Sequence, residues 1–235
     1  MRVVLVHGTM DRASSFAKVV SHLTDLDVVT YDRRGYGDAR AHPPSSLDDH
    51  IEDLQAQVEA RPAVIVGHSI GGDIALAVAT RCPDRALAVG AWEAPLAWMP
   101  WWPADSAGSR AVSEGLDPGD AAEIFMRGVV GDDVWERLPV STQQARRDEG
   151  TAMLVDIAGI REVSPFDPAA VKVPVLSGRG GDSKPYHRRA ADWLVDNVDG
   201  AELFEIPGAR HTAHTSHPAE FAAFVRKTVE RAHRA

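Results

Sequence analysis

The sequence has very little cysteine: Cys82 is the only one among 235 residues. A single cysteine forms no intramolecular disulfide and supplies no thiolate cluster for a structural metal. This excludes a disulfide-stapled secreted fold and favours a reducing compartment, so we expect a cytoplasmic protein. The chain also lacks an apolar run of about 18 residues, and its first run, at 2–6, is too short for the core of a signal peptide. We therefore expect neither a membrane segment nor export.

Positive charge is scarce as well. Lys and Arg total 25 against 34 Asp and Glu, which gives a net charge of −9 at pH 7 with His neutral. A negative protein repels nucleic acid and anionic lipid surfaces, and no basic stretch interrupts this sequence. We expect a small-molecule substrate and neither a nucleic-acid nor a membrane partner, while the sequence assigns no oligomeric state.

Short apolar runs alternate with helical patterns along most of the chain. Runs that are apolar on both faces are typical of parallel strands covered by helices. The expected strands are at 2–6, 27–31, 63–67, 86–92, 173–177 and 202–206, and the expected helices at 14–23, 47–60, 70–81, 184–197 and 219–231. This order predicts an α/β fold with an open, mostly parallel, doubly wound sheet of about six strands.

The alternation stops in the middle of the chain. Asp117-Pro118 opens a helical pattern that closes near Gly131, and Ser141 opens another, with a glutamine at its capping position. A helical insertion is expected there. The expected division is a core of residues 1–95 and 167–235 and an insertion of residues 96–166.

The stretch Gly67-His68-Ser69-Ile70-Gly71 joins an expected strand to an expected helix. Glycines two residues before and after a serine permit a turn so tight that the serine hydroxyl stands exposed at the carboxyl edge of the sheet. A glycine-rich turn also serves simply to pack a helix on a sheet, so this pattern alone leaves both interpretations open. A nucleophilic serine further needs a base, and a carboxylate to orient that base.

His211 follows the last expected strand, where such a fold places the base, and we predict that it takes the proton of Ser69. His214 and His217 lie nearby and compete for the role, although surface histidines are common. The spacing of His211 and His214 also occurs in metal sites, but the pattern lacks a third ligand. We therefore predict no metal and no cofactor.

Two carboxylates compete to orient His211. Asp182 follows the expected strand at 173–177, and Glu93 follows the expected strand at 86–92. An acid at a turn commonly serves only as a turn residue or helix cap. We favour Asp182 and keep Glu93 as the alternative.

The segment His7-Gly8-Thr9-Met10 follows the first expected strand. A tetrahedral oxyanion needs two fixed N–H donors. The N–H of Thr9, or of Met10, can pair with the N–H of Ile70 to form this oxyanion hole.

Trp98, Trp101 and Trp102 come soon after Glu93, among prolines that prevent an ordinary helix. Aromatic residues commonly fasten one layer of a protein to another. Pockets for small molecules are also lined mainly by apolar and aromatic side chains. We predict that at least one of the three contacts the substrate, which favours a small to medium apolar ester.

Taken together, these motifs resemble the α/β-hydrolase superfamily over nearly the whole chain. The matching residues are His7-Gly8, Tyr31-Asp32-Arg33-Arg34-Gly35-Tyr36-Gly37, Gly67-His68-Ser69-Ile70-Gly71-Gly72 and Gly208-Ala209-Arg210-His211 before Pro218-Ala219-Glu220-Phe221. The resemblance implies a Ser–His–acid hydrolase with a helical cap, on a sheet that lacks the first two strands that members usually carry. The turn at 31–37 is explained by its glycines, so we assign it no catalytic role.

The sequence departs from the family pattern at the acid. Members usually place it three residues after the strand-end glycine, whereas Asp182 lies four after Gly178. Glu93 looks like the alternative acid of haloalkane dehalogenases, but those enzymes and epoxide hydrolases use an aspartate nucleophile, which Ser69 argues against.

We therefore expect a cofactor-independent serine hydrolase that cleaves a carboxylic ester through an acyl-enzyme. Acyl transfer, perhydrolysis and carbon–carbon bond cleavage on the same triad stay open. A hydrolase fold that binds a small molecule without turnover is the alternative from another class.

Overall fold

A parallel sheet forms the centre of the computed structural model, which describes residues 1–112, 115–161 and 163–234. The strands have the order β2-β1-β3-β4-β5-β6, and each registered pair of neighbours is parallel. Their bounds are β1 Arg2–Val6, β2 Asp27–Thr30, β3 Ala63–His68, β4 Ala86–Trp92, β5 Val175–Gly180 and β6 Glu202–Ile206. The predicted α/β class with an open six-stranded sheet is confirmed.

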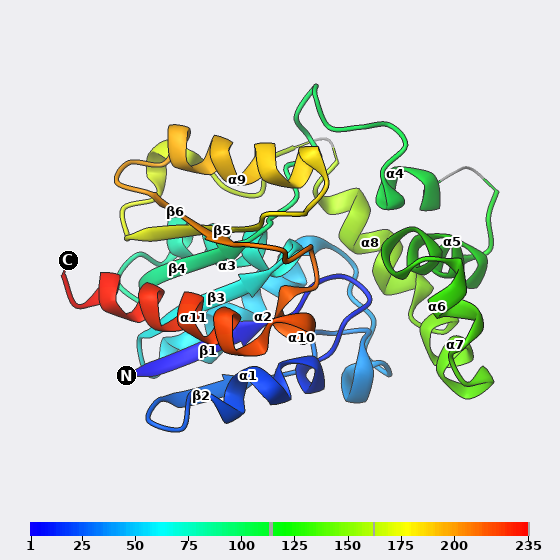
Figure 1. Cartoon of the computed structure of the whole chain (residues 1–235), viewed down its shortest axis with the longest axis horizontal. Helices are drawn as coiled ribbons and strands as arrows, with labels where there is room; N and C mark the ends of the chain where they lie inside the picture. The colour runs from blue at the N-terminus through cyan, green and yellow to red at the C-terminus, as the bar shows by residue number, and fades with distance from the viewer. Residues whose placement is uncertain (113–114, 162, 235) are drawn as a thin grey trace.

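Helices cover both faces of the sheet (Figure 1). One face packs against α2, α3 and α9 through a single apolar cluster, and the other packs against α1 and α11 through a second one. The helices outside the insertion are η1 Ala13–Phe16, α1 Ala17–Ser21, η2 Gly37–Ala39, α2 Leu47–Glu59, α3 Ile70–Arg81, η3 Pro168–Ala170, α9 Pro185–Asn197, α10 Ala213–Ser216 and α11 Pro218–Ala232. The two apolar layers cover the faces of the sheet and leave uncovered the side at which the strands end, called the carboxyl edge below.

The segment between β4 and β5 gathers beyond the ends toward which the strand arrows point (Figure 1). Its helices are α4 Ala107–Ala111, α5 Pro118–Val130, α6 Asp132–Glu136, α7 Val140–Arg147 and α8 Gly150–Gly159. Helices α4, α5, α6 and α8 share a third apolar cluster, to which the core contributes Met10 and Tyr36. This helical group therefore lies directly over the edge that carries the expected site.

Two expected element boundaries in this part of the chain had different outcomes. The helix predicted to open at Asp117 and close near Gly131 is α5, with the Asp117 carboxylate accepting a hydrogen bond from Gly119 N (2.8 Å). The prediction that Ser141 opens a helix is wrong. Ser141 lies inside α7, because the carbonyl of Pro139 already accepts the first N–H bonds of that helix.

Buried charges attach the insertion to the core. Asp156 on α8 accepts both terminal nitrogens of Arg33 (3.0 and 2.7 Å) and the hydroxyl of Tyr36 (2.6 Å), and the Arg33 and Asp156 side chains are fully buried. Burial alone raises the pKa of Asp156, but the charge of Arg33 and its hydrogen bonds hold that pKa well below the ordinary value. Glu149 makes a second link, to Arg12 (2.7 Å).

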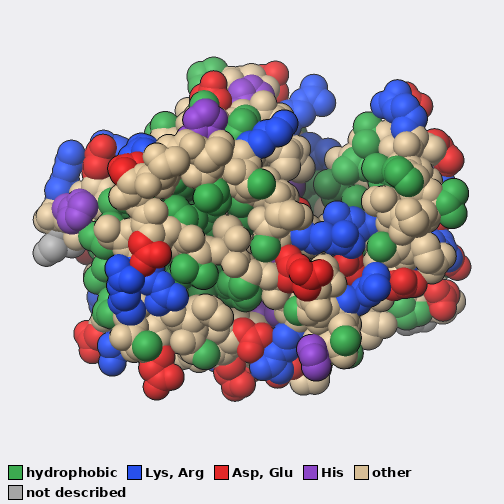
Figure 2. All heavy atoms as spheres, turned by 90° about the horizontal axis from the view of Figure 1, so that it is seen from below, with side chains coloured by type: hydrophobic (Ala, Val, Ile, Leu, Met, Phe, Trp, Pro, Cys, Tyr) green, Lys and Arg blue, Asp and Glu red, His purple; other side chains and the backbone are tan. Residues whose placement is uncertain are grey.

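The surface carries charges of both signs. Seen from below, acidic and basic side chains are interspersed and a notch separates the smaller lobe from the larger one (Figure 2).

Every helix within the described ranges is too short or too polar to cross a lipid bilayer.

Candidate active site

Ser69 lies in the tight turn between β3 and α3. Its backbone has φ 54° and ψ −132°, a region that side chains other than glycine rarely occupy. A Cβ on Gly67 would lie 2.0 Å from the carbonyl oxygen of Gly71, and a Cβ on Gly71 would lie 2.3 Å from that of Val6. Both positions require glycine, and Ser69 N donates to the carbonyl of Trp92 (2.8 Å). The turn is therefore held in the shape that presents a serine hydroxyl at the sheet edge.

His211 lies in the loop after β6, and its Nδ1 is 2.9 Å from Oε2 of Glu93. A carboxylate accepts, so Nδ1 carries the proton and Nε2 keeps its lone pair. The carbonyl oxygen of His211 accepts from His68 Nε2 (3.0 Å) and from Trp92 Nε1 (3.1 Å), which holds the loop in place. His211 and Ser69 line the same cavity. The geometry thus pairs His211 with a carboxylate that fixes the proton on Nδ1.

Glu93 directly follows β4 and is fully buried, with φ 44°. Its Oε1 accepts from Gly180 N (2.8 Å) and from the hydroxyl of Ser183, while Oε2 accepts from His211. Its own N–H donates to the carbonyl of Gly178 (2.9 Å). Hydrogen bonds to both oxygens compensate the loss of hydration that burial of a carboxylate costs.

The preference for Asp182 is corrected by this geometry. The strand expected at 173–177 is shifted, because β5 continues to Gly180, which is paired with Ile206 of β6. The turn that follows therefore begins later in the chain than expected. Within it, the hydroxyl of Ser183 donates to Glu93. The Asp182 side chain is exposed at the cavity wall. The carboxylate that contacts His211 is that of Glu93.

The expected oxyanion donors lie beside Ser69. Thr9 and Ile70 both line the cavity, and a Cβ on Gly8 would lie 2.9 Å from the Ser69 Cβ, so the loop after β1 passes directly next to the serine. Ile70 is the first residue of α3, where an N–H has no acceptor within the helix. The Thr9 hydroxyl donates to Asp156 on α8 (2.8 Å), which ties this loop to the insertion.

The cavity has a volume of about 440 Å³ and is lined by residues of both the core and the insertion. Apolar side chains from the insertion form much of its wall, namely Trp102, Phe125, Val129, Ile157 and Ile160. The cavity is thus within the usual size range of small-molecule sites and mainly apolar on the side that faces Ser69.

The three tryptophans have different surroundings. Trp102 lines the cavity. Trp98 packs edge-on against Phe166 with ring centroids 5.8 Å apart, and the Trp101 ring lies 4.5 Å from the guanidinium carbon of Arg189. Of the three, the structure brings only Trp102 to the wall of the cavity described above, so whether it contacts a substrate stays a prediction.

His187 is a site residue that the sequence did not indicate. Its ring stacks on that of His211, with centroids 4.3 Å apart and planes 20° from parallel, and it also lines the cavity. Burial, with the nearby His211 and Lys184, holds the pKa of His187 well below 6.5, so its ring is neutral. It shields one face of His211 without adding a charge. It lies in the first turn of α9, and no local motif marks it or Ser183.

Among the residues that the structure describes, two groups of side chains have donor atoms close enough together to hold a metal ion. One is Glu93, His187 and His211, which overlaps the site just described, and the other is Asp11, His68 and His214. His211 and His214, considered together in the sequence, contact different carboxylates.

Known proteins resemble this chain along most of its length. The sequence profile described as "Alpha/beta hydrolase family" matches residues 3–224. A pimeloyl-[acyl-carrier protein] methyl ester esterase of Neisseria meningitidis is 28% identical over 246 residues, which cover 97% of this chain and 93% of the relative. An sn-1-specific diacylglycerol lipase of Mus musculus is 28% identical over 169 residues, 68% of this chain, which spans only about half (48%) of that relative's length.

Solved structures extend the similarity to the fold. The crystal structure of the enol-lactonase from Burkholderia xenovorans LB400 superposes with a TM-score of 0.72 at 23% identity, covering 97% of this chain and 91% of that chain.

Proposed function

This chain belongs to the α/β-hydrolase family, and on that premise we propose that it is a serine carboxylesterase acting on small to medium apolar esters. Its membership and its esterase- and lipase-named relatives support a hydrolase. The observation that carries the finer proposal is the contact between Glu93 and His211 Nδ1 at the cavity that Ser69 lines.

In the proposed mechanism, Ser69 Oγ attacks the acyl carbon and His211 Nε2 takes its proton. Glu93 holds the proton on Nδ1 and stabilises the imidazolium that forms. The N–H groups of Thr9 and Ile70 bind the oxyanion. His211 then protonates the leaving alcohol, and a water molecule activated by the same imidazole releases the acid from Ser69.

The cavity supports the substrate class. A volume of about 440 Å³ suits a molecule of modest size, and the aromatic and aliphatic wall suits an apolar acyl or alcohol group. Two relatives described above are named for ester bonds: a methyl ester in one and the sn-1 position of a diacylglycerol in the other. Ester hydrolysis is the chemistry common to them.

A panel of p-nitrophenyl esters, thioesters and lactones tests the proposal. The wild type should prefer esters. Ser69→Ala should lower kcat by about a thousandfold or more at an unchanged melting temperature, because residues of a triad act as one unit. The matched control is Ser21→Ala, an exposed serine on α1, which should behave as wild type. Near-normal turnover by Ser69→Ala contradicts the proposal, and so does a wild type that hydrolyses no member of the panel.

A further inference from the structure

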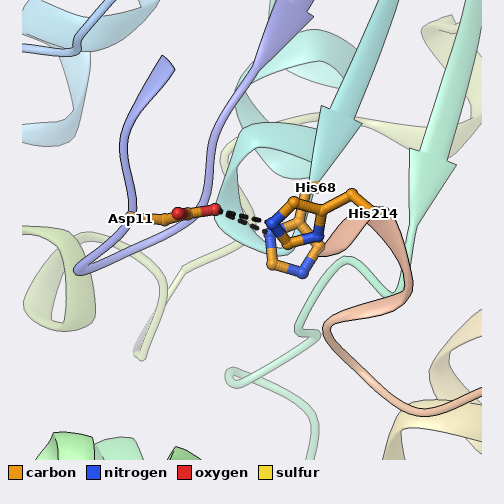
Figure 3. A group of neighbouring side chains, drawn as sticks. All are labelled: Asp11, His68 and His214. Carbon is orange, nitrogen blue, oxygen red and sulfur yellow. Dashed lines mark ion pairs between the residues drawn. The ribbon is translucent and has the colours of Figure 1, made fainter. Parts of the chain in front are cut away.

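Asp11, His68 and His214 come from three separate segments and point their polar atoms toward one another (Figure 3). Asp11 lies in the loop after β1, His68 ends β3, and His214 lies on α10. Asp11 Oδ2 is 3.0 Å from His214 Nε2 and 3.7 Å from His68 Nδ1. The two histidines are nearly inaccessible to solvent, whereas the Asp11 side chain is 19% exposed. The group therefore has one side that opens to solvent.

The protonation of His68 is set by its other nitrogen. His68 Nε2 lies 3.0 Å from the carbonyl oxygen of His211, which only accepts, so Nε2 carries the proton. Nδ1 is therefore the nitrogen of His68 that is left to accept a hydrogen bond or to bind a cation.

The lone pair of that nitrogen faces a negative charge. The group that faces it is the Asp11 carboxylate, whose Oδ2 lies 3.7 Å from His68 Nδ1 and 3.0 Å from His214 Nε2. His68 Nδ1 is buried and has no hydrogen-bond partner among the residues that the structure describes. Two acceptors thus face each other with no proton between them, which is unfavourable in a buried place.

A cation between these atoms removes the conflict. Zinc binds imidazole nitrogen and carboxylate oxygen at about 2.0–2.2 Å in tetrahedral geometry, which places ligand atoms roughly 3.3 Å apart. The two measured separations, 3.0 and 3.7 Å, lie on either side of that value. We propose that Asp11, His68 and His214 bind a divalent transition-metal ion such as Zn²⁺, with water from the exposed side as the fourth ligand.

The donor set favours a particular class of metal. Two imidazoles and one carboxylate suit Zn²⁺ and its first-row neighbours, whereas Ca²⁺ and Mg²⁺ prefer oxygen ligands. Binding uses the Nε2 lone pair of His214, the nitrogen that faces Asp11, and leaves His68 Nε2 on the carbonyl of His211. The metal joins the loop after β1, the residue before Ser69 and the segment after His211. It takes no part in the ester chemistry, and this inference does not rest on the proposed function.

The test is metal binding by the full chain after dialysis against EDTA and removal of the chelator. Calorimetric titration with ZnCl₂ should give one equivalent per chain and a higher melting temperature, and Co²⁺ should give the visible absorption of a tetrahedral site. Asp11→Asn and His214→Gln should each weaken binding by more than about a hundredfold, because loss of even an outer partner of a ligand costs 10- to 100-fold.

Two controls separate this site from its neighbours. His187→Gln dismantles the other metal-capable group, and His217→Gln removes a nearby histidine whose Nδ1 lies 2.9 Å from Ser216 Oγ. Both should bind as wild type. The proposal is overturned if wild type takes up no Zn²⁺ at micromolar free metal, if His187→Gln abolishes uptake, or if Asp11→Asn and His214→Gln bind normally. Near-UV circular dichroism checks that each variant is folded, and the Co²⁺ spectrum of His187→Gln should match that of wild type.

Discussion

The carboxyl edge of the sheet and the helical insertion meet at one cavity, but different interactions hold them. At the edge, the position of Ser69 follows from backbone hydrogen bonds and from two glycines whose space is filled by main-chain atoms. The insertion is attached through buried charges, chiefly the pair of Arg33 and Asp156. The edge therefore holds Ser69 in a fixed position, whereas the insertion supplies a cavity wall whose position depends on a few polar contacts.

The two kinds of contact differ in what they cost. A buried ion pair loses hydration that its own attraction only partly repays, but removal of one partner leaves the other charge buried and uncompensated. Backbone hydrogen bonds in a sheet carry no such penalty. A substitution in the buried charges of the insertion should therefore mainly lower the free energy of unfolding. A substitution at the carboxyl edge of the sheet should mainly lower the catalytic rate.

The largest effect is expected at the edge, on catalysis alone. Glu93→Gln keeps the shape of the side chain but no longer fixes the proton on His211 Nδ1, so kcat should fall about ten-thousandfold. Asp182→Asn is the matched control at the cavity wall and should change kcat only a few-fold. Steady-state kinetics on a p-nitrophenyl ester measure both. The reverse ranking would return the orienting role to Asp182.

A large effect on stability is expected where the insertion is attached. Asp156→Asn leaves Arg33 buried without its counter-charge, and the free energy of unfolding should fall by about 3–5 kcal/mol. Asp48→Asn breaks an exposed pair with Arg81 and should cost less than about 1 kcal/mol. Urea unfolding followed by circular dichroism compares the two. Equal small losses would mean that the charges do not hold the insertion.

A third prediction contrasts Asp156 with another buried carboxyl, Asp73 on α3. Both oxygens of Asp73 are buried without a hydrogen-bond partner in the described part of the chain, and burial raises its pKa well above 3.8. The folded state thus binds a proton that the unfolded state has lost, so stability falls as the pH rises above about 4.

Asp73→Asn removes this ionisation and should stabilise the protein at pH 7. The gain should shrink as the pH falls toward 3.8 and disappear below it, where Asp73 is protonated in both states. Thermal melts of wild type and variant between pH 4 and pH 8 give the comparison. A variant that is destabilised equally at every pH would show that Asp73 has a polar partner.

The smallest expected effect concerns the wall of the cavity. Trp102→Ala should move the preferred acyl length in a series of p-nitrophenyl esters, each methylene being worth about 0.8 kcal/mol. Trp98→Ala, which removes a ring that packs on Phe166, should lower the melting temperature and leave the preference unchanged. If both variants keep the wild-type preference, the insertion does not select the substrate through these rings.

The same difference between regions explains which parts could be predicted from the sequence. The turn around Ser69 is marked in the sequence by glycines at fixed offsets, although the backbone that excludes a side chain at Gly71 belongs to Val6 of β1. The position of His211 follows from the order of the strands. The choice between Glu93 and Asp182 depends on where β5 ends, which its pairing with β6 decides and local composition does not.

Side-chain contacts between residues far apart in the sequence could not be predicted from the sequence. Arg33 and Asp156 are 123 residues apart, and neither has a local pattern that names the other. His187 stacks on His211 only because α9 packs beside the loop after β6. Side-chain partners of this kind are fixed by tertiary packing, which one sequence does not encode in any short motif.

Labelling of the serine tests the central claim most directly. The intact protein is incubated with a fluorophosphonate, digested, and its modified peptides are identified by mass spectrometry. We predict one equivalent of label on Ser69, none in Ser69→Ala, and much slower labelling in Glu93→Gln. Label on a different serine, or ester hydrolysis that continues with Ser69 unmodified, would contradict the assignment of Ser69 as the nucleophile.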